Sequence, residues 1–219
     1  MMDQSLRTLL ISALPARGIP FTIPWIHTPS IPSGLRSFAT YPEWESYVLS
    51  LDLHSNVWVQ TRHRWSRVLN IYLLAWLDVD LIKAGELAAL TALEMALKER
   101  YGQHYATRKN GPENPPSLRV LLKHLVEQDG LTNDDIPIAK KWNTDMVARL
   151  YERDEDRRER RKNPMGVSPP ITIESIRNTA AHGDPFDTMP WGALLEVLRD
   201  LIHYADRDRL IQGSSIVFP

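Results

Sequence analysis

The chain has 219 residues, of which 43% are hydrophobic and 24% are charged, and its 26 Lys and Arg residues against 27 Asp and Glu residues leave a formal net charge of -1. This composition is typical of a globular protein with one domain and an extension, or with two small domains, and not of a protein whose whole surface binds nucleic acid or anionic lipid. Because the chain has no cysteine, disulfide scaffolds, thiolate nucleophiles and Cys-ligated metal sites are excluded.

The longest apolar stretch, at residues 68–77, is much shorter than the ~20 residues that a membrane-spanning helix needs. A signal peptide is a poor interpretation of the N-terminus, because Asp3 lies where its basic segment would be. We therefore expect a cytoplasmic protein with no membrane partner.

The first 42 residues contain six of the sixteen prolines, a density that disfavours helices. Residues 47–53 then alternate between apolar and polar, and the apolar residues 57–59 follow a polar triplet, which predicts two short strands or a hairpin. An irregular wrap fits equally well, and it would bury Trp25, Trp44 and Trp58 on the main domain. The sequence thus predicts a Pro-rich extended arm over residues 1–60.

From about residue 63 the apolar period becomes helical, and we expect a helical domain over residues 61–212. The apolar stripe of the first long helix consists of Trp65, Val68, Leu69, Tyr72, Leu73 and Trp76. Gly85 is expected to end this helix, and a second helix follows at residues 86–101, with Gly102 as its stop. The short turn between the two helices predicts antiparallel packing.

Four further helices are expected. The third follows Ser117 and buries four leucines, and the fourth runs from Pro137 along an apolar stripe into a charged run at residues 152–162. The fifth begins near Thr172 and ends at Gly183, and a sixth amphipathic helix covers residues 191–202. The predicted fold class is all-α, a helical bundle with a Pro-rich extension that has room for a β-hairpin.

The charged run begins acidic and ends basic. The acid-before-base pairs Asp154–Arg158 and Asp156–Arg160 favour an exposed helix. Its basic end is either an ordinary solvated helix face or a patch that contacts RNA. The residues of this basic patch are Arg157, Arg158, Arg160, Arg161 and Lys162.

Several common enzyme motifs are absent from the sequence. There is no GxGxxG dinucleotide loop, no GxxxxGK[ST] phosphate loop and no GxSxG nucleophile elbow. None of the seven histidines has a second histidine at i+3 or i+4, and no Glu-x-x-His occurs, so helical metal sites lack ligands at the needed spacing. We therefore expect no metal and no cofactor.

One polar string stands out, E-S-I-R-N-T-A-A-H-G-D-P at residues 174–185. His182 falls in the last helical turn, where the helix dipole and unpaired carbonyls favour a protonated imidazole that suits a general acid. Asn178 and His182 are four residues apart and lie on one side, whereas Arg177 and His182 are about 140° apart around the helix. Two copies of this helix across a two-fold axis would bring Arg177 of one chain near His182 of the other.

The string R-N-T-A-A-H is similar to the R-(polar)-x-x-x-H signature of HEPN domains, the helical domains of many prokaryotic toxins and defence ribonucleases. Other elements come in the family's usual order: a long helix, a helix with Ala92-Leu93-Glu94, a short leucine helix at residues 117–127, and a last amphipathic helix after the signature. The resemblance covers about residues 64–206 and leaves the N-terminal arm unexplained.

The resemblance implies metal-independent RNA cleavage by a homodimer of toxin–antitoxin or phage-defence type, with Arg177 and His182 of both chains as catalytic residues in one cleft. The RNA 2′-hydroxyl attacks the adjacent phosphorus, His182 moves a proton, and Arg177 donates to the phosphate oxygens as charge builds. Asn178 would orient His182 or the phosphate. The implied partners are RNA, a second copy of the chain, and a cognate antitoxin or nucleotidyltransferase-like protein.

Other interpretations stay open. Arg177 and His182 can instead be surface residues that cap a helix and pair with Glu94 or Asp184. The domain would then be a non-catalytic interaction module that binds RNA, a nucleotide or a partner protein, or a structural protein that dimerises through its arm.

Glu94 lies on the apolar stripe of the second helix, whose other members are Leu87, Leu90, Leu97 and Tyr101. A buried carboxylate needs a partner, and Arg177 is the candidate. The alternative is that Glu94 lies at an edge of the stripe that is open to water.

Overall fold

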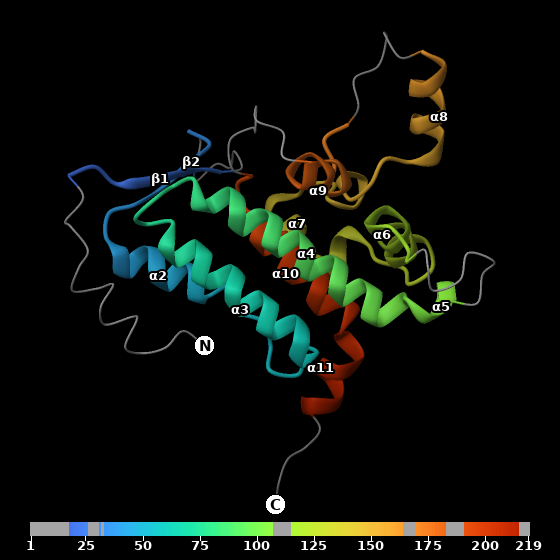
Figure 1. The fold of residues 1–219 in the computed structure, drawn as a ribbon, viewed down its shortest axis with the longest axis horizontal. Helices are drawn as coiled ribbons and strands as arrows, with labels where there is room; N and C mark the ends of the chain where they lie inside the picture. Colours follow the sequence, from blue (N-terminus) through green and yellow to red (C-terminus); the bar gives the residue numbers. More distant parts are fainter. Residues whose placement is uncertain are drawn as a thin grey trace, which may run out of the picture. The chain divides into compact units, whose positions relative to one another are not determined.

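The structure is a computed structural model, and it describes residues 18–25, 31, 33–106, 115–163, 170–182 and 191–214. These residues form ten α-helices and one two-stranded sheet, so the fold is mostly helical, as the sequence predicts (Figure 1). The chain divides into two compact units, a first unit of Met1–Leu93 and Thr188–Pro219 and a second unit of Glu94–Asp187. None of the described helices is both long and apolar enough to cross a membrane.

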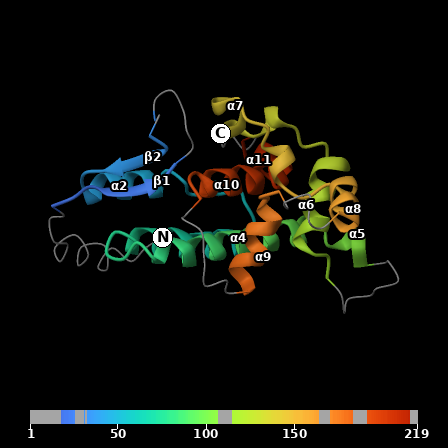
Figure 2. The same ribbon diagram turned by 90° about the horizontal axis from the view of Figure 1, so that it is seen from above.

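The first unit opens with an antiparallel hairpin of β1 (Phe21–Pro24) and β2 (Leu35–Phe38), which leads directly into helix α2 (Tyr41–Leu49) (Figure 2). The strands expected at residues 47–53 and 57–59 are wrong, because residues 47–49 belong to α2 and the later run leads into α3. The N-terminus of α2 explains this difference. Thr40 Oγ1 accepts from Glu43 N, Glu43 Oε2 accepts from Ala39 N, and Pro42 occupies the first turn, where its missing N–H costs nothing.

An aromatic core fills the first unit. We use this name for Phe21, Phe38, Trp44, Tyr47, Trp65 and Tyr72, all of which are buried. The Trp44 ring meets Phe21 and Phe38 edge-on, at centroid distances of 4.7 and 4.9 Å. Trp25 and Trp44 are buried, as the wrap interpretation expects, whereas Trp58 is only half-buried.

Helix α3 (Val59–Leu74) confirms the first predicted long helix, and the first half of α4 (Leu81–Tyr101) runs in the opposite direction beside it (Figure 1). Gly85 does not separate the two helices, because it lies inside α4. A Cβ at Gly85 would lie 2.5 Å from Cε2 of Tyr72 on α3. This glycine therefore permits close helix packing and does not act as a stop.

Helix α10 (Leu194–Ala205) confirms the sixth predicted helix, and the short helix α11 (Arg207–Ser214) comes after it. Hydrogen bonds tie α10 and its C-terminal cap to the N-terminal part of the same unit. Tyr47 Oη donates to Glu196 Oε1 at 3.0 Å, and Trp58 N donates to Asp206 Oδ2 at 3.0 Å. Segments far apart in the sequence thus share one core.

The second unit begins with the C-terminal half of α4, which ends at Tyr101 before Gly102 as predicted. It continues with α5 (Gln103–Ala106), α6 (Leu118–Glu127), the 3₁₀ turn Asn133–Asp135, α7 (Pro137–Trp142), the 3₁₀ turn Val147–Arg149, α8 (Asp154–Lys162) and α9 (Ile173–His182). The four leucines expected in α6 are buried.

The prediction of a single long fourth helix is wrong, because α7 ends after 6 residues. Asn143 adopts a left-handed conformation, with φ 49° and ψ 48°, which an asparagine tolerates better than most residues. The amide of Asn133 holds the chain after this break, since it donates to Asp145 Oδ1 and accepts from Val147 N, both at 2.9 Å.

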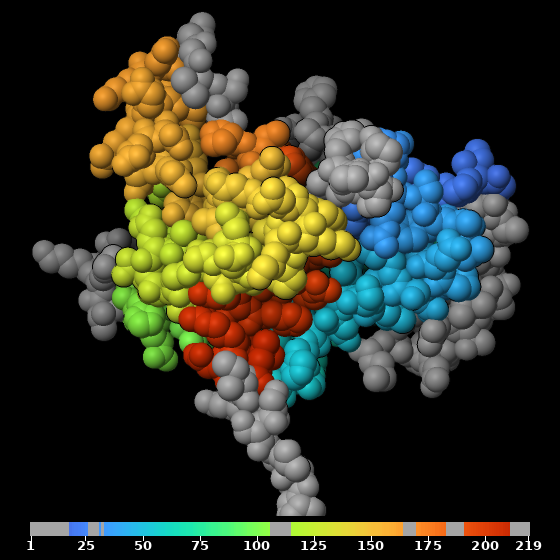
Figure 3. All heavy atoms as spheres, turned by 180° about the vertical axis from the view of Figure 1, so that it is seen from behind, coloured from blue at the N-terminus to red at the C-terminus, as the bar shows by residue number. Residues whose placement is uncertain are grey.

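Helix α8 has no buried residue and lies on the surface, in orange in Figure 3. Ion pairs hold it in place instead of apolar contacts. They join Arg119, Lys123, Glu152, Asp154, Arg160 and Glu174, which we call the ion-pair cluster. The predicted pairs Asp154–Arg158 and Asp156–Arg160 do not form within the described helix. Asp154 instead binds Arg119 and Lys123 of α6. Arg160 donates twice to Glu152, at 2.8 Å.

Candidate functional site

Helix α9 carries the polar signature and has the predicted extent within the described residues. Thr172 and Ser175 begin it with a reciprocal exchange: Thr172 N donates to Ser175 Oγ at 2.8 Å, and Ser175 N donates to Thr172 Oγ1 at 3.1 Å. These bonds satisfy N–H groups that the first helical turn leaves without partners. Helix α9 ends at His182. The expected stop Gly183 and the candidate partner Asp184 lie outside the described residues.

The predicted pairing of Glu94 with Arg177 is present. Arg177 Nε and Nη2 donate to Glu94 Oε2 at 3.1 and 2.9 Å, across 83 residues of sequence. Glu94 is only 9% exposed, so the alternative of a carboxylate open to water is wrong. Lys98, one turn further along α4, donates to the other oxygen, Oε1, at 2.6 Å.

The Glu94 carboxylate therefore stands between two cations. Burial by itself would raise its pKa, but the hydrogen bonds and charges of Lys98 and Arg177 outweigh burial and hold the pKa below its ordinary value. The group is ionised at neutral pH, and the three side chains together carry one net positive charge.

The remaining signature residues are accessible. The Arg177 side chain is 33% exposed, and its Nη1 lies 3.5 Å from Asn178 Oδ1. Asn178 and His182 are both exposed. Among the described residues no hydrogen bond or ion pair joins His182 to Arg177, so one chain does not bring the two together.

The N-terminal end of α9 is anchored by Arg119 of α6, a residue that the sequence analysis missed. Its Nη2 donates to the carbonyl of Glu152 at 2.9 Å and to Asp154, and its Nε lies 3.6 Å from Glu174 on α9. Burial raises the pKa of Glu174, although Arg119 lowers it. Arg119 thus links α6, the start of α8 and the start of α9.

Only part of the predicted basic patch on α8 is open to solvent. Arg160 is committed to Glu152, and Arg157 is half-buried. Arg158, Arg161 and Lys162 are exposed and face solvent. An RNA contact on α8 would therefore use these three side chains.

Two histidines outside α9 form a second polar group. The rings of His104 and His124 are 5.1 Å apart, and Tyr105 Oη lies 3.1 Å from His124 Nδ1. Burial, followed by the neighbouring His104, lowers the pKa of His124. Within the described ranges, no group of three or more His, Asp or Glu side chains is arranged to hold a metal ion.

No family model, no curated protein and no solved structure matches the chain. The function of this site is therefore inferred from its residues.

Proposed function

We propose that the chain is a HEPN-like endoribonuclease of toxin or defence type, which cleaves RNA without a metal ion as a homodimer. The observation that carries this proposal is the ion pair between Arg177 and Glu94. It links the helix with Ala92-Leu93-Glu94 to the R-N-x-x-x-H helix, the two elements on which the resemblance rests. A guanidinium, an amide and an imidazole then lie on one short helix, with the last two exposed.

The residues suit phosphodiester transesterification. The 2′-hydroxyl attacks the adjacent phosphorus and the bond to the 5′-oxygen breaks, which leaves a 2′,3′-cyclic phosphate and a 5′-hydroxyl. Arg177 donates to the non-bridging oxygens as their charge grows, and His182 transfers a proton to or from a reacting oxygen. Asn178 orients the phosphate or the imidazole.

A dimer completes the site. Arg177 and His182 are about 140° apart around α9, so a single helix does not direct both at one phosphorus. A two-fold axis beside α9 brings Arg177 of one chain toward His182 of its partner. RNA would enter along a surface that includes Arg158, Arg161 and Lys162.

Glu94 is a positioning residue in this proposal. By accepting from Nε and Nη2, it fixes one edge of the Arg177 guanidinium and leaves Nη1 directed away from that carboxylate. A fixed guanidinium loses less side-chain entropy when it binds a phosphate.

Cleavage of total RNA and tRNA in EDTA tests the proposal, with wild type, His182→Ala and Arg177→Ala compared and product ends analysed. We expect cyclic-phosphate ends from wild type and at least a hundredfold loss in either variant. The matched controls are His63→Ala and Arg64→Ala, which remove exposed side chains of the same types from α3. Equal cleavage by all five proteins, or none by the folded wild type, would contradict the proposal.

The same ion pair favours a second candidate, a non-catalytic module that binds RNA or a partner protein. In that case Arg177 serves only to neutralise Glu94. Glu94→Gln separates the candidates, since it removes the charge but keeps the size. A positioning role predicts that cleavage falls while RNA binding stays within about twofold, whereas the module has no cleavage to lose.

A further inference from the structure

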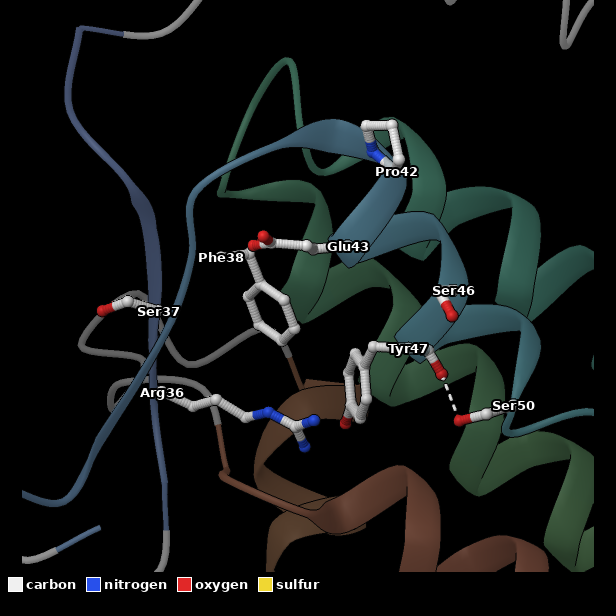
Figure 4. A pocket seen from close by; sticks show the side chains of 8 residues that line it. All are labelled: Arg36, Ser37, Phe38, Pro42, Glu43, Ser46, Tyr47 and Ser50. Atoms are coloured by element: carbon white, nitrogen blue, oxygen red, sulfur yellow. Dashed lines mark hydrogen bonds between the residues drawn. The ribbon is translucent and has the colours of Figure 1, made fainter.

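An open pocket of about 640 Å³ lies in the first unit, between β2 and α2 (Figure 4). Its volume is within the range of small-molecule sites. The lining residues are Arg36, Ser37, Phe38, Pro42, Glu43, Ser46, Tyr47 and Ser50. None of them belongs to the proposed ribonuclease site.

The positive charge of the pocket comes from Arg36 on β2. Its guanidinium carbon lies over three aromatic rings, 4.3 Å from the centroid of Tyr47, 4.7 Å from Trp25 and 5.2 Å from Phe38. The rings hold the guanidinium in one orientation through cation–π attraction and shield part of it from water. Figure 4 shows the side chain extended from the strand toward Tyr47.

Among the described residues, no hydrogen bond or ion pair is made by the Arg36 guanidinium. The aromatic rings are only weak acceptors and do not satisfy the five N–H groups of the guanidinium. A half-buried guanidinium with its donors uncommitted is suited to a planar or tetrahedral anion.

Two carboxylates near Arg36 each have one oxygen bound to another donor, and neither forms an ion pair with Arg36 among the described residues. Glu43 Oε2 accepts from Ala39 N at 2.8 Å as part of the α2 cap. Glu196 Oε1 accepts from Tyr47 Oη at 3.0 Å, and its Oε2 is buried without a hydrogen-bond partner in the described part of the chain. Burial raises the pKa of Glu196 above its ordinary value although Arg36 lowers it. Neither carboxylate therefore occupies the N–H groups of the Arg36 guanidinium that would bind a ligand.

The wall of the pocket formed by α2 carries hydroxyl groups. Ser46 and Ser50 are one turn apart on α2, and both are exposed. Ser50 Oγ donates its hydrogen to Tyr47 O at 2.6 Å. Among the described residues the Ser46 hydroxyl makes no such bond, so its hydrogen can be donated to a ligand. Ser37 on β2 shares its hydroxyl with Thr22 at 2.9 Å.

We propose that this pocket binds the phosphate group of a small phosphate monoester, with the guanidinium of Arg36 as its main ligand and Ser46 as a second donor. A phosphate offers more acceptor oxygens than a carboxylate, in a tetrahedral arrangement that donors from two walls can reach. The fork of Arg36 binds two of these oxygens, and the Ser46 hydroxyl binds another.

Titration calorimetry on the full chain tests the site with glycerol 3-phosphate, glycerol and glycerate as matched probes. We expect glycerol 3-phosphate to bind with a Kd below about 1 mM, and glycerol and glycerate to bind at least tenfold more weakly. Inorganic phosphate competes with glycerol 3-phosphate if the phosphate group is what the site binds.

The variants are Arg36→Gln, Arg36→Lys and Ser46→Ala, with Arg67→Gln as the control, because Arg67 is an exposed arginine on α3 of the same unit. Arg36→Gln should weaken binding at least tenfold, and Arg36→Lys should weaken it severalfold because a lysine lacks the fork. Ser46→Ala should weaken it about threefold, and Arg67→Gln should leave it within about twofold. Circular dichroism of each variant checks the fold.

Three results would overturn the proposal. The first is that the folded wild type does not bind glycerol 3-phosphate, in which case Arg36 only packs over the aromatic rings and binds no ligand. The second is glycerate binding as tightly as glycerol 3-phosphate, and the third is equal weakening by Arg36→Gln and Arg67→Gln, which would indicate unspecific charge attraction.

Discussion

The aromatic core of the first unit is stabilised by apolar burial, whereas the ion-pair cluster of the second unit is stabilised by charged side chains. In the aromatic core, Trp44 and Trp65 are fully buried, and the indole N–H of each donates to one backbone carbonyl at 2.8 Å. In the ion-pair cluster, α8 buries no residue and is attached through charged side chains that remain partly exposed.

This difference indicates which perturbations each region resists. Apolar burial contributes about 25 cal/mol per Å² and is little affected by salt, whereas exposed ion pairs are weak and are screened. The aromatic core should therefore be sensitive to lost volume, and the ion-pair cluster to salt and to the loss of single charges. The candidate ribonuclease residues Arg177 and His182 lie in the second unit.

Trp44→Ala should have the largest effect. It removes a fully buried ring together with its hydrogen bond to the carbonyl of Tyr72, so the free energy of unfolding should fall by about 3–5 kcal/mol. Chemical denaturation measures this loss. Trp58→Ala is the control, since Trp58 is only half-buried, and an equal loss in both variants would mean that burial does not distinguish the two tryptophans.

Arg119→Met should cost about 1–3 kcal/mol in the second unit, because hydrogen bonds to charged groups contribute this much when they are partly buried. Hydrogen exchange should show faster opening of α8 and of the first turn of α9, which Arg119 joins. The difference from wild type should shrink at high salt. Arg158→Met, at an exposed position of α8, should leave exchange unchanged.

His203 should make the first unit weaker in mild acid. Burial, followed by the charge of Arg199, lowers its pKa, and its Nε2 accepts from His54 N at 3.1 Å, which requires a neutral ring. Since the unfolded chain binds the proton more readily, the stabilisation is complete above about pH 6.5 and is lost as pH falls below it. Chemical denaturation between pH 7.5 and 5.5 should show the free energy of unfolding falling with pH. His203→Gln should weaken this pH dependence, whereas His63→Gln should leave it unchanged.

Asp154 should show the smallest effect. The hydrogen bonds from Lys123 and Arg119 lower the pKa of this exposed carboxylate to about 2. Its contribution to stability is present above the ordinary pKa and is lost as pH falls toward 2. NMR titration of the side-chain carboxyl measures the pKa directly, and an ordinary value would show that the ion pairs around α8 do not persist in solution.

Much of the fold can be deduced from local sequence pattern. The apolar stripes of α3, α6 and α10 and the stop at Gly102 could be predicted because they depend on residues within one helix. The pairing of Glu94 with Arg177 could also be predicted, since a carboxylate on an apolar stripe requires a cation. Lys98 could have been found in the same way, because it is four residues from Glu94 on the same helix.

Other features depend on contacts that no local pattern contains. Gly85 lies within a helix because Tyr72 packs against it, and Asn143 ends α7 because the side chain of Asn133 binds the chain beyond the break. The partners of Arg119 are more than thirty residues away. The same holds for the pocket at Arg36, whose walls are a strand and a helix that the sequence pattern did not place.

A mixing experiment tests the central claim most directly, namely that Arg177 of one chain and His182 of its partner form one ribonuclease site. Arg177→Ala and His182→Ala, each inactive alone, are mixed in equal amounts under conditions that allow subunits to exchange. Half of the dimers are then heterodimers, and each keeps one of the two cross-chain pairs of Arg177 and His182, so about a quarter of wild-type RNA cleavage should return. If wild type cleaves RNA and the mixture remains inactive, the shared site is wrong.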